Sequence, residues 1–177
     1  MTTKWIMKYR MKKIGGWDLT LSVYILRTRL VVAGCSSIDC PLNNRVYAKY
    51  KLAGDVKTLT DSLTLSANLG DGNDSVIINK SVNTDSFQLP MSYQRSEDVF
   101  FMEIKNTTGS QFDTIKVSKT NTPHFEAVDC NPAIFHVITG VKYTKNRIDT
   151  IVINNSNVTY DATKSTFLIH FKNSSSN

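Results

Sequence analysis

The sequence predicts an all-β domain, built as an antiparallel β-sandwich or a barrel-like Greek-key fold and preceded by a signal-like N-terminal segment. Short runs rich in β-branched and aromatic residues recur roughly every 10–13 residues, and clusters of Gly, Asn, Asp and Ser separate them. Past Cys35 no helical periodicity is sustained. The chain has 177 residues, of which 41% are hydrophobic, which is enough for one domain with its own core.

Ten segments carry the strand pattern, and in most of them apolar and polar residues alternate, so that one face is expected in the core. The run from Val99 to Ile104 is more continuously apolar, which is typical of a strand covered on both faces. Pro90 is expected to end its strand or place it at a sheet edge, because proline cannot donate to the ladder. Pro123 predicts a bend before His124. The expected strands are 46–52, 63–67, 76–78, 87–89, 99–104, 114–117, 134–138, 141–143, 149–153 and 166–171.

The excess of positive charge is confined to the start of the chain. The first 34 residues contain seven Lys and Arg and one Asp, whereas 14 basic and 14 acidic residues follow. The remainder is therefore neutral on balance and lacks the basic surface that polyanion binding requires. We expect no nucleic-acid partner.

These first 34 residues have the layout of a secretory signal. A basic head from Lys4 to Lys13 precedes an apolar stretch from Leu19 to Leu26. The residues Val32-Ala33-Gly34-Cys35 resemble a bacterial lipobox, in which the cysteine is acylated and becomes the first residue of the mature protein. Two arginines, Arg27 and Arg29, interrupt the apolar stretch. A cytoplasmic domain that keeps its basic N-terminus therefore stays open as the alternative.

The expected organisation has four parts. Residues 1–34 form a lipoprotein-type signal segment, 35–43 a tether, 44–172 a single β domain and 173–177 a disordered tail. Lipidation of Cys35 would place the domain in the cell envelope, anchored to the outer membrane and facing the periplasm, with the membrane itself as a partner. A misassigned start, with Met11 as the true one, would tighten the basic head but would leave both arginines in place.

Three cysteines bear on the compartment. If Cys35 carries lipid, Cys40 and Cys130 remain as a pair, and an oxidising periplasm would allow them to form a disulfide. The alternative is two unrelated buried thiols. Neither cysteine belongs to a C-x-x-C motif, so the spacing does not favour a zinc site.

A three-residue pattern of Asp, a hydroxyl residue and an apolar residue occurs five times, beginning at Asp61, Asp74, Asp85, Asp113 and Asp149. Turn chemistry explains it, because an Asp carboxylate can accept a hydrogen bond from the backbone two residues further on, just before a strand begins. The alternative is glycosylation, since four of the five resemble the acceptor of protein O-glycosylation in the Bacteroides group. The hydroxyls concerned would be Ser62, Ser75, Thr114 and Thr150.

Two groups of residues are weak candidates for a metal. Asp71 and Asp74 lie in Gly-Asp-Gly-Asn-Asp, which offers carboxylates to Ca²⁺ but lacks the full EF-hand spacing, and a tight hairpin loop explains the same residues. His124, Glu126 and His136 could bind a transition metal or perform acid–base chemistry. A histidine in an apolar strand, as His136 is, more often belongs to the core.

No catalytic motif is recognisable: there is no G-x-S-x-G, no Walker loop and no dinucleotide-binding glycine turn. We therefore expect a non-enzymatic binding or structural module without a cofactor, whose partner is an envelope protein or glycan. The alternative is a metal-dependent enzyme or metal-binding domain that uses His124, Glu126 and His136.

Four segments carry a family resemblance: Ser36–Asn44, Phe87–Met91, Val117–Phe125 and Ile138–Gly140. From about Cys35 to Lys172 the chain resembles a family of small uncharacterised lipoproteins from Bacteroidetes bacteria, a domain of unknown function. The resemblance implies an envelope location and an all-β fold, and it implies no substrate and no catalytic residue. The leader departs from the family in the charges that break its apolar run.

Overall fold

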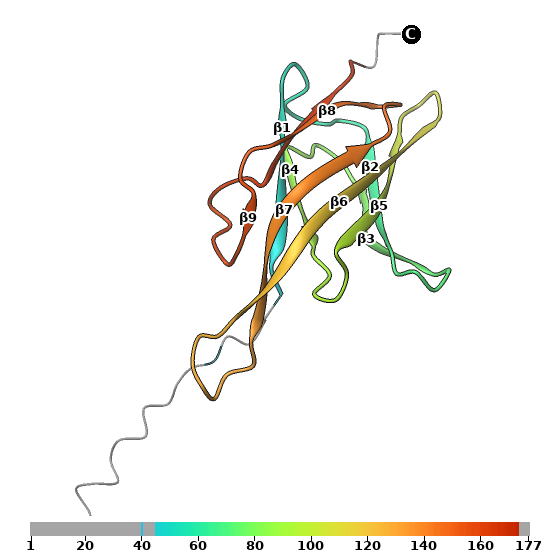
Figure 1. Cartoon of the computed structure of the whole chain (residues 1–177). Coiled ribbons are helices and arrows are strands. Elements are labelled where there is room, and N and C mark those ends of the chain that lie inside the picture. The colour runs from blue at the N-terminus through green and yellow to red at the C-terminus, as the bar shows by residue number, and fades with distance from the viewer. Residues whose placement is uncertain (1–39, 41–44, 174–177) are drawn as a thin grey trace, which may run out of the picture. The chain divides into compact units, whose positions relative to one another are not determined.

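In a computed structural model, which describes Cys40 and residues 45–173, the domain consists of two β-sheets (Figure 1). None of these residues forms a helix, and so none supplies a helix that could span a membrane. The ten strands are β1 (Tyr47–Ala53), β2 (Ser62–Asn68), β3 (Asp74–Ser81), β4 (Ser86–Pro90), β5 (Glu97–Lys105), β6 (Ser110–His124), β7 (Ala133–Tyr143), β8 (Ile148–Ile153), β9 (Asn157–Val158) and β10 (Phe167–Phe171).

One sheet has four strands in the order β4-β1-β10-β8, and the other has six in the order β3-β2-β5-β6-β7-β9. Neighbouring strands are antiparallel except β1 and β10, which pair in parallel. The chain passes from one sheet to the other after β1, β3, β4, β7, β8 and β9. The prediction of an all-β, mainly antiparallel domain is confirmed.

Alternation along the strands produces the core. In β1 the inward residues Ala48, Tyr50 and Leu52 are buried, and their neighbours are partly or fully exposed. The Tyr50 ring stacks between Phe87 of β4, with ring centroids 5.0 Å apart, and Phe167 of β10, 4.6 Å apart. Each large side chain buried in this way contributes about 1.5–3 kcal/mol through the apolar surface it removes from water.

Strand β5 alternates as well, which corrects the expectation that it is covered on both faces. Phe100, Met102 and Ile104 are buried, whereas Val99 and Phe101 are only half-buried. A largely apolar run therefore lies here in a sheet with one core-facing side. The outer residues can be apolar because cross-strand neighbours on the same face of the sheet, such as Thr114 and Lys116, partly cover them.

Pro90 and Pro123 differ in their outcomes. Pro90 is the last residue of the edge strand β4, as expected. The bend expected at Pro123 is wrong, because β6 runs through this residue, which lies opposite Ile134 of β7. Strand β5 accompanies β6 only as far as Ser118, so beyond that point one side of β6 has no neighbouring strand in the ladder. Proline is tolerated at such an edge position.

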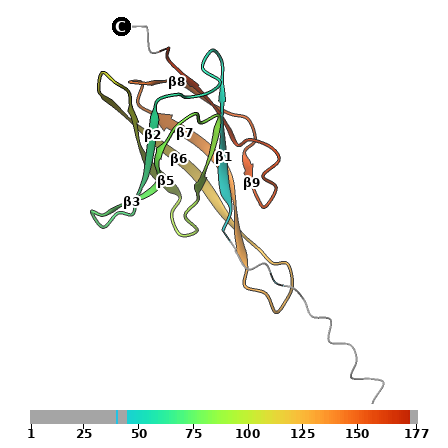
Figure 2. The ribbon, with the colours of Figure 1, turned by 180° about the vertical axis from the view of Figure 1, so that it is seen from behind.

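Beyond the end of β5, strands β6 and β7 continue as a two-stranded hairpin, which we call the β6–β7 arm (residues 119–138). Figures 1 and 2 show the arm extending past the other strands. The separately predicted segments 134–138 and 141–143 form the single strand β7, and the short strand β9, which was not predicted, pairs with His136 and Val137 of the arm.

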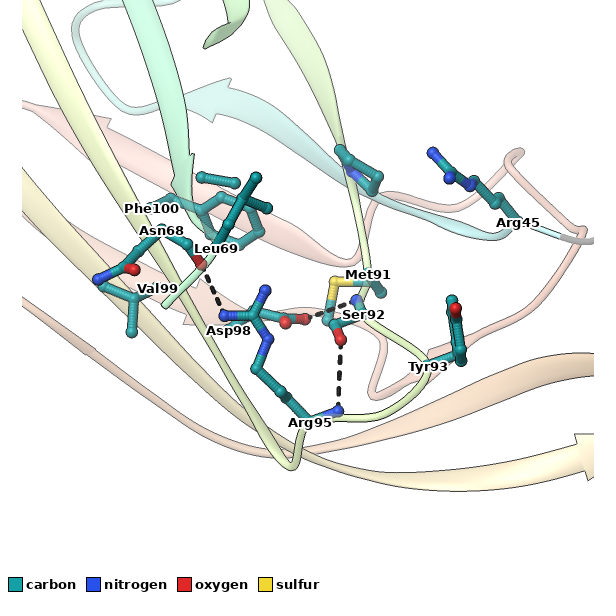
Figure 3. Close-up of a pocket in the computed structure, with 12 residues that line it drawn as sticks. Arg45, Asn68, Leu69, Met91, Ser92, Tyr93, Arg95, Asp98, Val99 and Phe100 are labelled. Atoms are coloured by element: carbon teal, nitrogen blue, oxygen red, sulfur yellow. Dashed lines mark hydrogen bonds between the residues drawn. The ribbon is translucent and has the colours of Figure 1, made fainter. Parts of the chain in front are cut away.

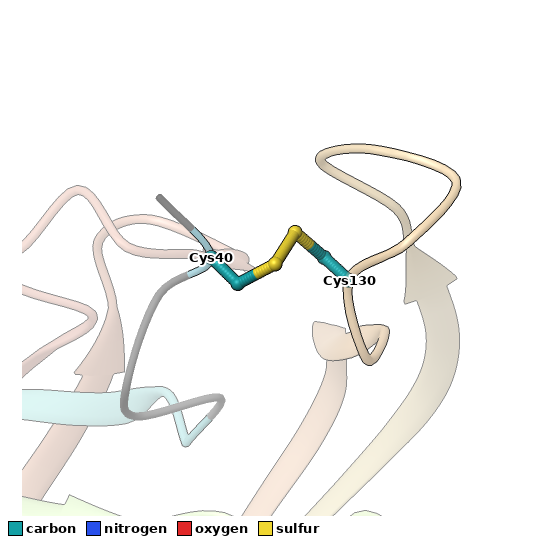
Figure 4. The surroundings of a disulfide bond; sticks show 2 residues. All are labelled: Cys40 and Cys130. Atoms are coloured by element: carbon teal, nitrogen blue, oxygen red, sulfur yellow. A yellow bond between two sulfur atoms is a disulfide. The ribbon is translucent and has the colours of Figure 1, made fainter. Parts of the chain in front are cut away.

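A disulfide joins the loop of this arm to Cys40, which precedes β1. The sulfurs of Cys40 and Cys130 are bonded, their Cα atoms lie 5.4 Å apart, and 90 residues separate them in the sequence (Figure 4). The lipidation candidate Cys35 lies outside the described residues, as do the predicted signal segment 1–34, the rest of the predicted tether except Cys40, and residues 174–177.

Asp113 has a different role from the predicted strand-opening turn. It is buried within β6, and its carboxylate accepts hydrogen bonds from the backbone N–H groups of Asn146 (2.8 Å), Arg147 (2.7 Å) and Ile148 (2.9 Å), and from the Thr144 hydroxyl (2.6 Å). It therefore satisfies the donors of the β7–β8 connection. Asp149 likewise lies inside its strand, whereas β2, β3 and β4 do begin at or just after Asp61, Asp74 and Asp85.

Candidate functional site

A pocket of about 190 Å³ opens beside the loop that joins β4 to β5, residues 91–96 (Figure 3). Its apolar wall includes Met91 and Phe100. Leu69 and Tyr93 also line the pocket, and 49% and 60% of their surfaces are exposed. Its charged members are Arg45, Arg95 and Asp98.

The loop has this shape because β4 ends at Pro90 and the following backbone groups find partners close by. The Ser92 N–H donates to Oδ2 of Asp98 at 3.1 Å, and the Arg95 N–H donates to the Ser92 hydroxyl at 3.3 Å. The Arg95 side chain reaches back to the end of β2, where its Nη1 donates to the Asn68 carbonyl at 2.6 Å. The pocket loop is thus attached to both neighbouring strands.

The buried ammonium group of Lys119 stabilises the β4–β5 loop from the interior of the domain. The Lys119 side chain is fully buried, and its Nζ donates to the carbonyls of Ser92 and Arg95, both at 2.5 Å, and to Oδ1 of Asn121 at 3.2 Å. It also lies 3.4 Å from Oδ2 of Asp98. These acceptors replace the water that the ammonium group loses on burial, and the ammonium group replaces the water that the two loop carbonyls lose.

Asn121 and His136 extend this network into the arm. The Asn121 amide nitrogen donates to the carbonyls of Tyr93 and Arg95, each at 3.1 Å, and its oxygen lies 2.8 Å from Nδ1 of His136. Because that oxygen can only accept, the neutral imidazole carries its proton on Nδ1. We call Asp98, Lys119, Asn121 and His136 the buried polar network.

Burial sets the protonation behaviour of this network. Desolvation raises the pKa of Asp98, and Lys119 acts in the opposite direction. Desolvation lowers the pKa of Lys119, and Asp98 opposes this shift. The pKa of His136 falls to about 4, first because of burial and then because of the nearby Lys119 charge, so the ring is neutral at pH 7. Tyr50 is also held neutral, since burial and then Asp98 raise the pKa of its hydroxyl, which has no hydrogen-bond partner among the described residues.

This arrangement is suited to binding. The Asp98 carboxylate is already engaged by the Ser92 N–H and by Lys119, and the His136 ring is buried beneath the loop. The surface of the pocket presents apolar and aromatic side chains next to the guanidinium of Arg95. Such a surface fits a ligand with an apolar group next to an acidic one.

The three residues of the metal alternative are not brought together. His124 and Glu126 form an exposed pair, with Nε2 and Oε1 3.1 Å apart, whereas His136 is buried and bonded to Asn121. In the ladder His124 lies opposite Ala133, three positions further along the arm than the Asn121–His136 pair. Within the described part of the chain, no three His, Cys, Asp or Glu residues are grouped to hold a metal.

The β2–β3 loop is explained by its backbone. The Asn73 N–H donates to Oδ1 of Asp71 at 3.0 Å, and Gly70 and Gly72 both have φ of 83°, a region that favours glycine. Asp74 already belongs to β3. The hairpin therefore accounts for these residues without a ligand.

The four candidate glycosylation residues lie in strands. Ser75 is exposed, and Ser62, Thr114 and Thr150 are half-buried.

Sequence reasoning missed most of the site, namely Asp98, Lys119, Asn121 and the loop residues around Tyr93. A signal was present. Asp98 shares the inward parity of Phe100 and Met102, and Lys119 shares that of Val117. A charge at a core-facing position of two adjacent strands indicates a buried pair.

The architecture is that of an all-β domain with a loop pocket above a buried charge network. The chain belongs to a family of unknown function (DUF6452), whose family pattern matches residues 62–171, more than half of its length. The matched region runs from β2 to β10 and contains the whole buried polar network. No curated protein and no solved structure matches the chain.

Loss of the Lys119 charge will destabilise the domain more than its size suggests. In Lys119→Met the Asp98 carboxylate and two loop carbonyls stay buried without their partner, and we expect a loss of about 3–5 kcal/mol in the free energy of unfolding, measured with urea at pH 7. The exposed Lys116→Met on the same strand is the matched control and should change little. Adding Asp98→Asn to Lys119→Met should recover part of the loss. Equal stability of the two methionine variants would refute the network.

Stability will fall as the pH is lowered from 7 to 5, because of His136. The folded ring has a pKa of about 4, and the unfolded ring keeps one near 6.5, so the unfolded chain takes up the proton first. Linkage then predicts a loss of about 2 kcal/mol over this interval. His136→Gln removes the titrating group, so its unfolding free energy should vary less with pH. Parallel curves for the two proteins would contradict the assignment.

Proposed function

We propose that the protein is a non-enzymatic binding module of the cell envelope, anchored by lipid at Cys35 to the outer membrane and facing the periplasm. It binds an envelope protein through the pocket beside the β4–β5 loop. On this proposal the chain is one of the small lipoproteins of Bacteroidetes that it resembles.

The disulfide between Cys40 and Cys130 is the observation that carries the proposal. Disulfides persist in oxidising compartments and are rare where glutathione keeps thiols reduced. The disulfide therefore favours an address outside the cytoplasm.

The placement of charge supports the same address. The basic residues in excess all precede Val32-Ala33-Gly34-Cys35, and removal of residues 1–34 leaves a domain with equal numbers of acidic and basic residues. A cleavable segment explains why the positive charge is confined to one end.

The pocket supports binding rather than catalysis. Lys119 beneath the loop is engaged in holding it, the exposed members of the pocket are Arg45, Leu69 and Tyr93, and Arg95 is half-buried. Aromatic residues and arginine are enriched where proteins contact one another. A protein partner that offers an apolar side chain beside a carboxylate is the best match.

Replacement of Cys35 tests the anchor. We expect Cys35→Ser to leave the membrane fraction, whereas the wild type and the neighbouring Ser36→Ala stay in it, because only Cys35 supplies the thiol for the thioether to lipid. Mass measurement of the mature chain should show that it begins at residue 35 and carries acyl groups. A Cys35→Ser protein that remains with the membrane like the wild type refutes the anchor.

A photoreactive phenylalanine analogue at position 93 tests the pocket. We expect a discrete crosslinked product in intact cells from position 93 and none from position 112. Phe112 is the matched control, since it is 61% exposed and Tyr93 is 60% exposed. The product should disappear in Arg95→Ala. The same products from both positions, or none from position 93, would refute binding at the pocket.

A further inference from the structure

The loop at the end of the β6–β7 arm, residues 125–132, exposes two large apolar side chains. Phe125 is 64% exposed and Val128 is 99% exposed. We call this loop the arm tip. In Figures 1 and 2 it is the part of the domain furthest from the loops that join β5 to β6 and β7 to β8.

The arm is built to hold its tip in place. The His124 ring stacks on Phe135, with centroids 4.2 Å apart, and the Tyr160 ring meets Phe135 edge-on at 5.1 Å. Strand β9 pairs with the outer edge of β7 at His136 and Val137. These contacts tie both strands of the arm to the segment that follows β9.

The disulfide attaches the arm tip to a residue that follows the proposed anchor closely in the sequence. Cys130 belongs to the tip and is bonded to Cys40, which is only five residues from Cys35. Five residues of fully extended chain span at most about 18 Å. Without the disulfide, Cys35 would be joined to Arg45 through ten residues of chain, whose length allows at most about 36 Å. The cross-link thus halves the largest distance that the connecting chain allows between the domain and a lipid at Cys35.

We propose that the arm tip is a membrane-contacting surface, on which Phe125 and Val128 enter the headgroup region of the bilayer that holds the lipid anchor. The inference rests on the proposed lipidation of Cys35. Exposed aromatic and aliphatic side chains at a loop tip gain by leaving water for this region.

The charges of the tip select the kind of lipid surface. Glu126 and Asp129 follow the two apolar residues in the sequence, and Oε1 of Glu126 lies 3.1 Å from Nε2 of His124. Two carboxylates oppose contact with an anionic surface and tolerate a zwitterionic one. The partner is therefore a bilayer rich in zwitterionic headgroups.

The pocket loop shares this end of the molecule. The β2–β3 loop with Leu69 and the β4–β5 loop with Tyr93 lie at the same end of the sheets as the arm (Figure 1). On this proposal, the two loops beside the pocket also lie on the side of the domain that faces the bilayer.

Tryptophan fluorescence tests the contact directly. The two tryptophans of the sequence, Trp5 and Trp17, precede Cys35, so the processed chain contains none. Phe125→Trp introduces a single reporter at the tip, and Phe112→Trp introduces one at the opposite end, where the replaced side chain is 61% exposed compared with 64% at Phe125. Each processed, lipidated protein is reconstituted into phosphatidylcholine vesicles with brominated acyl chains.

We expect emission from Phe125→Trp to be quenched by the bromine and to shift to shorter wavelength, and emission from Phe112→Trp to be unchanged. Vesicles rich in phosphatidylglycerol should quench Phe125→Trp less. If both variants float with the vesicles and neither is quenched, the tip does not contact the bilayer although the anchor exists. If neither variant floats, the anchor fails and the tip proposal fails with it.

A longer tether tests the part played by the disulfide. Cys40→Ser with Cys130→Ser leaves Phe125 and Val128 in place and frees the tip from the short connection. We expect quenching of Phe125→Trp to weaken in this background, with circular dichroism showing that the sheets remain. Undiminished quenching would show that the disulfide does not position the tip.

Discussion

The described structure depends on strand β6 remaining extended for 15 residues. Two charged side chains on the inward face of β6 stabilise the loops that lie next to the strand. Asp113 accepts hydrogen bonds from three successive backbone N–H groups of the β7–β8 connection, and Lys119 donates to two carbonyls of the β4–β5 loop. Buried backbone groups in a loop need partners that a sheet ladder cannot provide. β6 supplies an anion at one end and a cation near the other, so a single strand fixes loops on opposite ends of the domain.

The strands could be predicted from sequence because a one-sided sheet imposes a period of two, which the apolar residues of β1 and β2 display. The length of β6 could not. Its second half, Lys119-Thr-Asn-Thr-Pro, has the composition of a loop, and it is a strand only because β7 pairs with it. The site was missed for a related reason. A lysine looks like a surface residue until the register of β5 and β6 places it beside Asp98, and register is a property of the fold rather than of either segment.

The disulfide adds stability of a kind that the sheets do not provide. In the chain-entropy view, closing a loop of this length is worth about 4–5 kcal/mol, because the cross-link restricts the unfolded chain. In the folded domain it joins Cys40, seven residues before β1, to the arm tip, and no strand pairing in the described part of the chain connects β1 with the arm. β1 lies between β4 and β10 in the centre of the smaller sheet, so fixing the chain ahead of it limits fraying of that sheet from its N-terminal side.

The two proposals constrain each other through geometry. A domain whose arm tip lies in the headgroup region has its pocket loop on the bilayer side, and the arm itself holds that loop away from the headgroups. The space below the loop lies between the domain and the bilayer, so it suits an extended segment or a loop of a neighbouring protein better than a large folded partner. Attachment of that neighbour to the same membrane reduces the entropy that it loses on binding. The buried network beneath the loop favours this mode of binding, since a pocket loop fixed by Lys119 and Asn121 loses little further freedom when the segment docks. Membrane attachment and a rigid pocket loop would then both reduce the entropy lost on binding, so that a small contact area suffices to bind the partner.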